Sequence, residues 1–125
     1  MTNKQFVILC VDDDADILDQ MKTVLEANGY RMVGAGSAEA GLKQYKESKP
    51  DLVIVDLMME EVDAGTSLVK ELKALGNKAP IFMLSAVGDQ LSSNISPTDL
   101  GLSGVFQKPI EFKSLLSTLK TKLKA

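Results

Sequence analysis

Carboxylates stand at the ends of two strongly apolar stretches of this 125-residue chain. Residues 6–11 are continuously apolar and run directly into Asp12 and Asp13, and the apolar residues 52–55 run into Asp56. A carboxylate at the end of a buried strand is costly unless a cation, a hydrogen bond or a turn stabilises it. Taken alone, each of these acids is more often a turn or cap residue than part of a site.

A hydroxyl and an ammonium group follow two further stretches that have the character of strands. Ser85 comes directly after residues 81–84, and Lys108 comes directly after residues 104–107. Alone, Ser85 would be a hydrogen-bonding residue at a strand end, and Lys108 would be an exposed lysine. Because every one of these groups comes at the end of a predicted strand, a chance arrangement is improbable, and we expect the groups to share one edge of a sheet.

The apolar runs predict the strands of that sheet, and the stretches between them have helical periodicity. The third run is β-branched and continuously apolar, as in a strand that is covered on both faces. Strands that alternate with helices predict an α/β protein, an open parallel (βα)₅ sheet in the doubly wound order 2-1-3-4-5. The predicted strands are residues 6–11, 30–35, 52–55, 81–84 and 104–107.

Caps and stops predict the helix boundaries. Asp14 and Ser37 are typical N-cap residues, Gly29 and Pro50 stop helices, and a closing amphipathic helix is expected from Glu111. These signals place the helices between the strands, as the parallel topology requires.

Two of the helical segments are harder to define. We expect the third helix to begin at Thr66 or Ser67 and to carry Leu75 on its apolar face before Gly76 ends it. Residues 86–104 are poor in helix formers, so we expect the fourth helix to be short or irregular.

The composition is that of an ordinary globular protein, and we predict one domain over residues 1–125. Hydrophobic residues make up 45% and charged residues 25%, and the formal net charge is -3. That charge argues against nucleic acid as a direct partner, and no apolar run approaches the ~18 residues of a membrane span. Cys10 lies inside an apolar run and is predicted to be a small buried hydrophobe, consistent with a cytoplasmic protein.

In the predicted order the first and third strands are neighbours, so Asp12, Asp13 and Asp56 would enter one crevice. Like charges this close repel one another and oppose folding unless a cation neutralises them. With no histidine and a single cysteine in the chain, the ligands are hard oxygens, which suit Mg²⁺ and exclude zinc. Lys108 and Ser85 would meet the oxygens of an incoming phosphoryl group, and Asp56, on the central strand, is the best candidate nucleophile.

The acids, together with Ser85-Ala86 and Lys108-Pro109, resemble the motifs of the receiver domain of response regulators in two-component signalling, over essentially the whole chain. The resemblance implies a flavodoxin-like fold in which Asp56 is the phosphoacceptor. It also implies that Mg²⁺ is held by Asp12, Asp13, Asp56 and the backbone carbonyl of Met58.

The same resemblance implies roles for the remaining motif residues and for partner proteins. Ser85 and Lys108 would bind the phosphoryl oxygens, and the peptide bond before Pro109 would be cis. The donor would be a sensor histidine kinase or a phosphotransfer protein, and a separate downstream protein would receive the signal. Catalysis would be limited to the domain's own phosphorylation and slow dephosphorylation, as expected of a switch rather than an enzyme.

The chain departs from the family pattern at three places. Glu60 stands in the loop after the phosphoacceptor where the family usually has proline. The position of the family's switch aromatic is Val105, and the neighbouring Phe106 is expected on the opposite face of its strand. Residues 86–104 are poor in helix formers, in a segment that usually contributes to the family's output surface.

Two other functions fit parts of the sequence. Asp12 and Asp14 form the Asp-x-Asp pattern of a haloacid-dehalogenase-like phosphatase, although that family expects Thr or Val where this chain has Asp16. The alternative from the class of binding proteins is a receiver-like module that works without phosphorylation.

Overall fold

The computed structural model describes residues 5–56, 64–85, 103–107 and 111–123. Within these ranges the strands form one parallel sheet of order β2-β1-β3-β4-β5, so the predicted doubly wound order is confirmed. In this order β2 and β5 are the two edge strands. The strands are β1 (Val7–Val11), β2 (Arg31–Ala35), β3 (Leu52–Asp56), β4 (Ile81–Ser85) and β5 (Gly104–Gln107).

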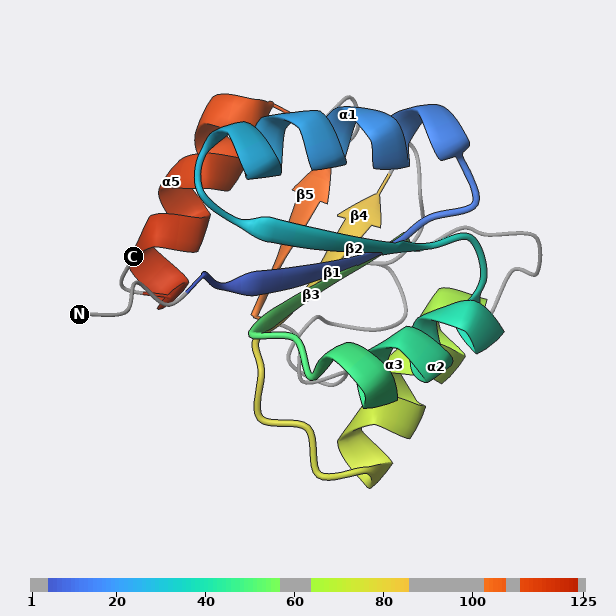
Figure 1. Ribbon diagram of the computed structural model, residues 1–125. Coiled ribbons are helices and arrows are strands. Elements are labelled where there is room, and N and C mark those ends of the chain that lie inside the picture. The colour runs from blue at the N-terminus through green and yellow to red at the C-terminus, as the bar shows by residue number, and fades with distance from the viewer. Residues whose placement is uncertain (1–4, 57–63, 86–102, 108–110, 124–125) are drawn as a thin grey trace.

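Helices cover both faces of the sheet, with α1 and α5 on one side and α2 and α3 on the other (Figure 1). Asp14 and Ser37 are the N-caps of the first two helices, as predicted. None of the described helices has both the length and the apolar character needed to cross a membrane. The helices are α1 (Ala15–Ala27), α2 (Ala38–Ser48), α3 (Ala64–Ala74) and α5 (Phe112–Leu123).

Alternation along the strands divides the core into two separate layers. Side chains at odd-numbered strand positions, such as Val11 and Val55, are buried against α2 and α3. Those at even-numbered positions, such as Ile8 and Ile54, are buried against α1 and α5. Successive strand residues point to opposite faces, and each residue pairs with a residue of the same parity on the neighbouring strand, so one parity serves each layer across the whole sheet.

The predicted orientations in the fifth strand are confirmed. Val105 packs against the odd-numbered layer, whereas Phe106 packs against the even-numbered one. The ring of Phe106 stacks on that of Phe82, with 5.1 Å between the ring centroids. Phe106 is therefore part of the packing beneath α5 and does not reach the layer in which Val105 packs.

The third helix differs from the prediction at both ends. It begins at Ala64 rather than at Thr66 or Ser67, and it ends at Ala74. Leu75, predicted on the buried face, is 52% exposed. Leu75 is the last residue with an α-helical hydrogen bond, from its N–H to the Glu71 carbonyl, and the chain turns at Gly76, at φ 83°, which donates to the Lys73 carbonyl. Leu75 therefore lies at the end of the helix, where it lines the surface instead of the core. The prediction of a short or irregular fourth helix lies largely outside the described residues.

Glycine is required where α2 crosses β1. A Cβ atom on Gly41 would lie 2.8 Å from Cγ2 of Val11 and 3.1 Å from Cδ2 of Leu68. Val11 is fully buried in the middle of the sheet and its β-branched side chain is stiff, so it cannot easily move aside. The close approach brings α2 directly over the residue that precedes Asp12.

We expect Gly41→Ala to destabilise the protein. Alanine in a helix usually gains about 1 kcal/mol over glycine. Overpacking a core costs about 1–3 kcal/mol, and with a stiff neighbour at 2.8 Å this second effect should win. Urea unfolding measures the difference in the free energy of unfolding.

Gly36→Ala is the matched control, because a Cβ at Gly36 meets no atom within 4 Å. Its free energy of unfolding should stay within about 0.5 kcal/mol of the parent protein. If Gly41→Ala unfolded at the same or a higher urea concentration than the parent, the close helix–sheet contact would be wrong.

Candidate metal and phosphoryl site

Strand pairing brings two of the predicted site residues together. β1 and β3 lie side by side, and the last residues in their register are Val11 and Val55. The next residue of each strand is an aspartate, Asp12 in one and Asp56 in the other. Because the strands are parallel, both carboxylates leave the sheet at the same edge.

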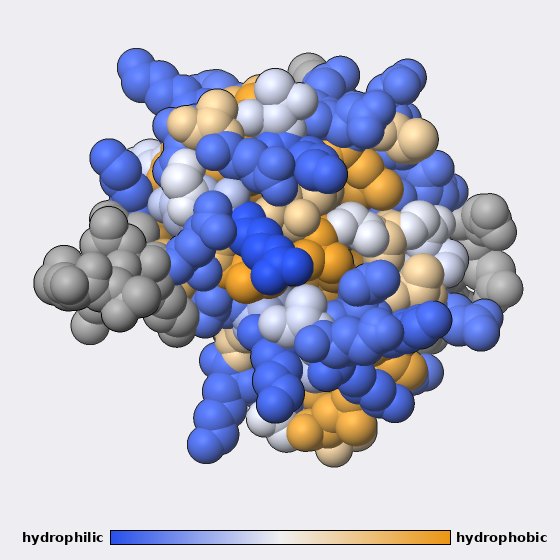
Figure 2. Space-filling model, viewed as in Figure 1, coloured by the Kyte–Doolittle hydropathy of each residue, from blue (hydrophilic) through white to orange (hydrophobic). Residues whose placement is uncertain are grey.

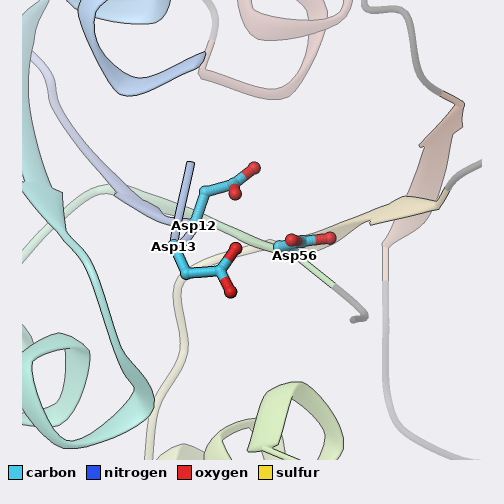
Figure 3. Close-up of side chains that lie close together, drawn as sticks. All are labelled: Asp12, Asp13 and Asp56. Carbon is cyan, nitrogen blue, oxygen red and sulfur yellow. The ribbon is translucent and has the colours of Figure 1, made fainter. Parts of the chain in front are cut away.

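The structure gathers three aspartates at this edge, as predicted (Figure 3). Asp12 and Asp56 are almost completely buried, with 1% and 2% of their surface exposed. Asp13, the next residue after Asp12, is exposed and offers its carboxylate from the solvent side. Two buried carboxylates beside a third acid are an expensive arrangement, which is typical of a functional site rather than of a simple turn.

The loop after β1 separates the roles of its acids. One carboxylate oxygen of Asp12 accepts a hydrogen bond of 2.9 Å from the backbone N–H of Asp14. Asp14 turns away to cap α1, with its own carboxylate accepting from the backbone N–H groups of Asp16 and Ile17. The loop is therefore shaped by the helix start, and it directs Asp12 and Asp13 toward Asp56 (Figure 3).

The spacing of the carboxylates suits a small divalent cation. One oxygen from each of Asp12, Asp13 and Asp56 can be chosen so that all three lie within 4.8 Å of one another. Mg²⁺ binds oxygen at about 2.1 Å, so ligands on opposite sides of the ion are about 4.2 Å apart. Small side-chain adjustments would complete such a site, and the set of hard carboxylate oxygens fits Mg²⁺ by chemistry as well.

Cys10 adds no ligand to this cluster, although it lies two residues before Asp12. Its side chain is 1% exposed, which confirms the prediction of a buried hydrophobe. Burial, and after it the charge of Asp12, raises the pKa of the Cys10 thiol far above its usual range. A thiol held in its neutral form is a poor nucleophile and a poor metal ligand.

The other predicted site residues are only partly described. Ser85 is the last residue of β4 and pairs with Gln107 at the end of β5, so its backbone lies at the edge where the aspartates gather. Its side chain, Lys108 and Met58 lie outside the described residues, as does the peptide bond before Pro109. Among the described residues, the acidic cluster contains no member that the sequence analysis had missed.

Comparison with known proteins agrees with this geometry. A family model described as the response regulator receiver domain matches residues 8–120. The response regulator MprA of Mycolicibacterium vanbaalenii is 30% identical over 117 residues, and the match covers 94% of this chain and 50% of MprA. The chain thus spans about half the length of the MprA relatives it matches.

Solved structures show the same fold. A CheY-like receiver domain protein from Methanospirillum hungatei is 28% identical, has a TM-score of 0.86, and is matched over 97% of this chain and 95% of that one. A receiver domain protein from Clostridium thermocellum is 26% identical with a TM-score of 0.84, over 95% of this chain and 94% of that one. These proteins have the sheet order and helix arrangement described above.

We expect Mg²⁺ to stabilise the protein through the aspartates. Without metal, Asp13→Asn should raise the free energy of unfolding by about 1 kcal/mol, because one of three neighbouring like charges is removed. With Mg²⁺ at a hundred times its dissociation constant the parent should gain about 2.7 kcal/mol, and the variant much less. Thermal unfolding in EDTA and in MgCl₂ measures both effects.

Asp19→Asn is the control, since Asp19 is an exposed acid of α1 outside the cluster. It carries the same change in charge and should respond to Mg²⁺ as the parent does. An equal gain in the parent and in Asp13→Asn would show that the ion does not bind at this cluster.

Cys10 should be unreactive in the folded protein. Iodoacetamide at mildly alkaline pH should leave the native thiol unmodified and should alkylate it after denaturation, because only the thiolate reacts and burial disfavours it. Intact-mass spectrometry distinguishes the two forms. Alkylation of the native protein at the rate seen for the denatured chain would contradict the burial of this side chain.

Proposed function

Because the chain belongs to the response regulator receiver family, we propose that it is a signalling switch controlled by phosphorylation of Asp56. The observation that carries the proposal is the buried carboxylate of Asp56 at the end of the central strand, beside Asp12 and Asp13. Members of this family are signalling modules. Their function depends on a change of state rather than on the turnover of a diffusible substrate.

In the proposed reaction a carboxylate oxygen of Asp56 attacks the phosphorus of a phosphohistidine. The new O–P bond forms as the P–N bond breaks, and the imidazole leaves with the bonding electron pair and takes up a proton. The burial of Asp56 supports this role, because a carboxylate removed from water loses the hydration that would shield it as a nucleophile. The product is an acyl phosphate on the protein.

The residues proposed to hold Mg²⁺ are Asp12, Asp13 and Asp56, with the backbone carbonyl of Met58. When bound, the ion would neutralise negative charge on the phosphoryl oxygens and between the carboxylates. The hydrogen bond from the Asp14 N–H fixes the carboxylate of Asp12 before any ion arrives. This part of the site is therefore preorganised by the backbone.

Ser85 and Lys108 are proposed to bind the phosphoryl oxygens, Ser85 with its hydroxyl and Lys108 with its ammonium group. The position of Ser85 at the carboxyl end of β4, next to β3, supports its part. The role of Lys108 and a cis peptide bond before Pro109 rest on the family pattern. Dephosphorylation would be slow and would use the same groups.

A sensor histidine kinase or a phosphotransfer protein is the proposed donor, and a separate protein is the proposed receiver of the signal. The absence of a direct nucleic-acid or membrane partner and the cytoplasmic location stay predictions. Since the chain spans about half the length of its MprA relatives, their names do not define its own output.

The structure favours the switch over the phosphatase considered from the sequence. A haloacid-dehalogenase-like enzyme would need Asp12 and Asp14 together at the reacting centre. The carboxylate of Asp14 instead caps α1 through two backbone N–H groups, whereas Asp56 lies with Asp12 and Asp13. The cluster thus contains the acids of the receiver motif.

We expect acetyl phosphate and Mg²⁺ to add one phosphoryl group to the protein, as detected by intact-mass spectrometry. Asp56→Asn should abolish the mass increase because the nucleophile is lost, and EDTA should abolish it in the parent. Asp19→Asn, with the same change in charge on α1, should be phosphorylated as the parent is.

The outcome separates the competing functions. An unchanged mass in the parent under these conditions would favour a module that works without phosphorylation. Turnover of free phosphomonoesters that survives in Asp56→Asn but is lost in Asp12→Asn would favour the phosphatase.

A further inference from the structure

A groove lies at the edge of the sheet opposite the aspartates, between the C-terminal ends of α2 and α3. The chain enters β3 and β4 beside it, so the groove is at the amino ends of these strands and Asp56 is at the carboxyl end. The length of β3, about 13 Å, therefore separates the groove from Asp56. We call it the basal groove, and its main lining residues are Tyr45, Lys46, Lys49, Pro50, Leu75 and Lys78.

An exposed apolar side chain lines this groove. Leu75 is 52% exposed and is the one large hydrophobic residue in the described part of the chain that stands open to solvent. Figure 2 shows hydrophobic surface at the lower end of the molecule, where α3 ends in Figure 1, with hydrophilic side chains beside it. Tyr45, which is half-buried, and Pro50, which is buried, form the floor beside it.

Three ammonium groups surround that apolar lining. Lys46, Lys49 and Lys78 are all exposed, and they come from α2, from the residue after it and from the segment before β4. The chain as a whole carries a net charge of -3, so this cluster of positive charge is opposite in sign to the net charge of the protein. Favourable interaction with the C-terminal carbonyls of α2 explains Lys46, but not Lys78, which is outside any helix.

Lys49 occupies a backbone conformation that normally selects glycine. Its φ is 49°, and it is the single non-glycine residue with positive φ among those described. The ends of α1 and α3 use Gly29 and Gly76 in the corresponding left-handed position. A lysine there costs conformational free energy that glycine would not, which points to a use for the side chain itself.

Hydrogen bonds hold the wall of the groove in place. The Tyr45 hydroxyl donates to Oδ1 of Asn77 over 2.8 Å, which ties α2 to the segment before β4. The Asn77 side chain also accepts from the N–H of Ala79 and donates to its carbonyl. The groove is therefore preorganised, which lowers the entropic cost of binding.

We propose that the basal groove docks an acidic segment of a partner protein, with an apolar side chain on Leu75 and carboxylates beside Lys46, Lys49 and Lys78. An apolar centre with a charged rim is the usual anatomy of a protein interface. A small phosphate-like anion fits less well, because it would leave the exposed side chain of Leu75 uncovered. Docking here is independent of Asp56.

The test uses the full chain and fluorescein-labelled octapeptides that carry several Glu and Asp residues around one Leu or Phe. Fluorescence anisotropy should detect binding, and amide NMR shifts should change at Lys49, Leu75 and Lys78. Leu75→Ser should weaken binding about tenfold or more, since it removes an apolar anchor without disturbing the core.

Lys49→Gly is the sharpest variant, because it should weaken peptide binding while raising the melting temperature. Opposite changes in the two measurements would separate a role in binding from a role in folding. Lys113→Ser on α5 is the matched control for loss of one exposed lysine and should bind the peptides as the parent does. Asp56→Asn, which removes the proposed phosphoacceptor, should bind the peptides as the parent does. The peptide experiment and the phosphorylation experiment can therefore fail independently of each other.

Three results would overturn the proposal: no binding to any acidic peptide, equal weakening by Lys113→Ser and Lys49→Gly, or unchanged binding by Leu75→Ser. Binding to anionic phospholipid vesicles in preference to the peptides would assign the groove to a membrane surface and would also overturn it.

Discussion

The parallel pairing of β1 with β3 is the constraint on which the site depends. Two buried strands in register must end together, and since Asp12 directly follows β1 and Asp56 is the last residue of β3, the fold itself places Asp12 beside Asp56. The apolar residues of these strands contribute to stability by about 1.5–3 kcal/mol for each fully buried large side chain. That gain offsets the cost of holding carboxylates close together, and it keeps them in place without requiring a bond between them.

The two edges of the sheet have different chemistry because parallel strands have different ends. At the carboxyl edge, Asp56 at the end of β3 meets Asp12 and Asp13 of the loop after β1, and the backbone N–H of Asp14 holds the carboxylate of Asp12. At the amino edge, helices end and lysines gather around Leu75.

Strand positions, sheet order and the acidic cluster could all be predicted, because apolar runs and right-handed crossovers leave few topologies for a chain of this length. Asp14 and Ser37 marked helix starts correctly since capping is a local interaction.

The start of α3 was misplaced because Asp63 and Thr66 are both residue types that begin helices. Leu75 was misplaced because helical periodicity does not show how far the helix stays covered by the core, and Leu75 lies at its very end, directly before the turn at Gly76. The grouping of the three lysines at the basal groove could not be predicted, because they come from three separate segments and no local pattern in the sequence connects them.

The division of strand residues by parity has a consequence for how the sequence can change. Odd-numbered positions such as Val53 and Met83 contact one layer of helices, and even-numbered positions such as Ile54 and Leu84 contact the other. Substitutions in one layer therefore need compensation only within that layer. The two layers of the core can evolve, or be redesigned, independently of each other. A homologue could replace nearly every side chain under α5 while the packing under α2 stayed as it is.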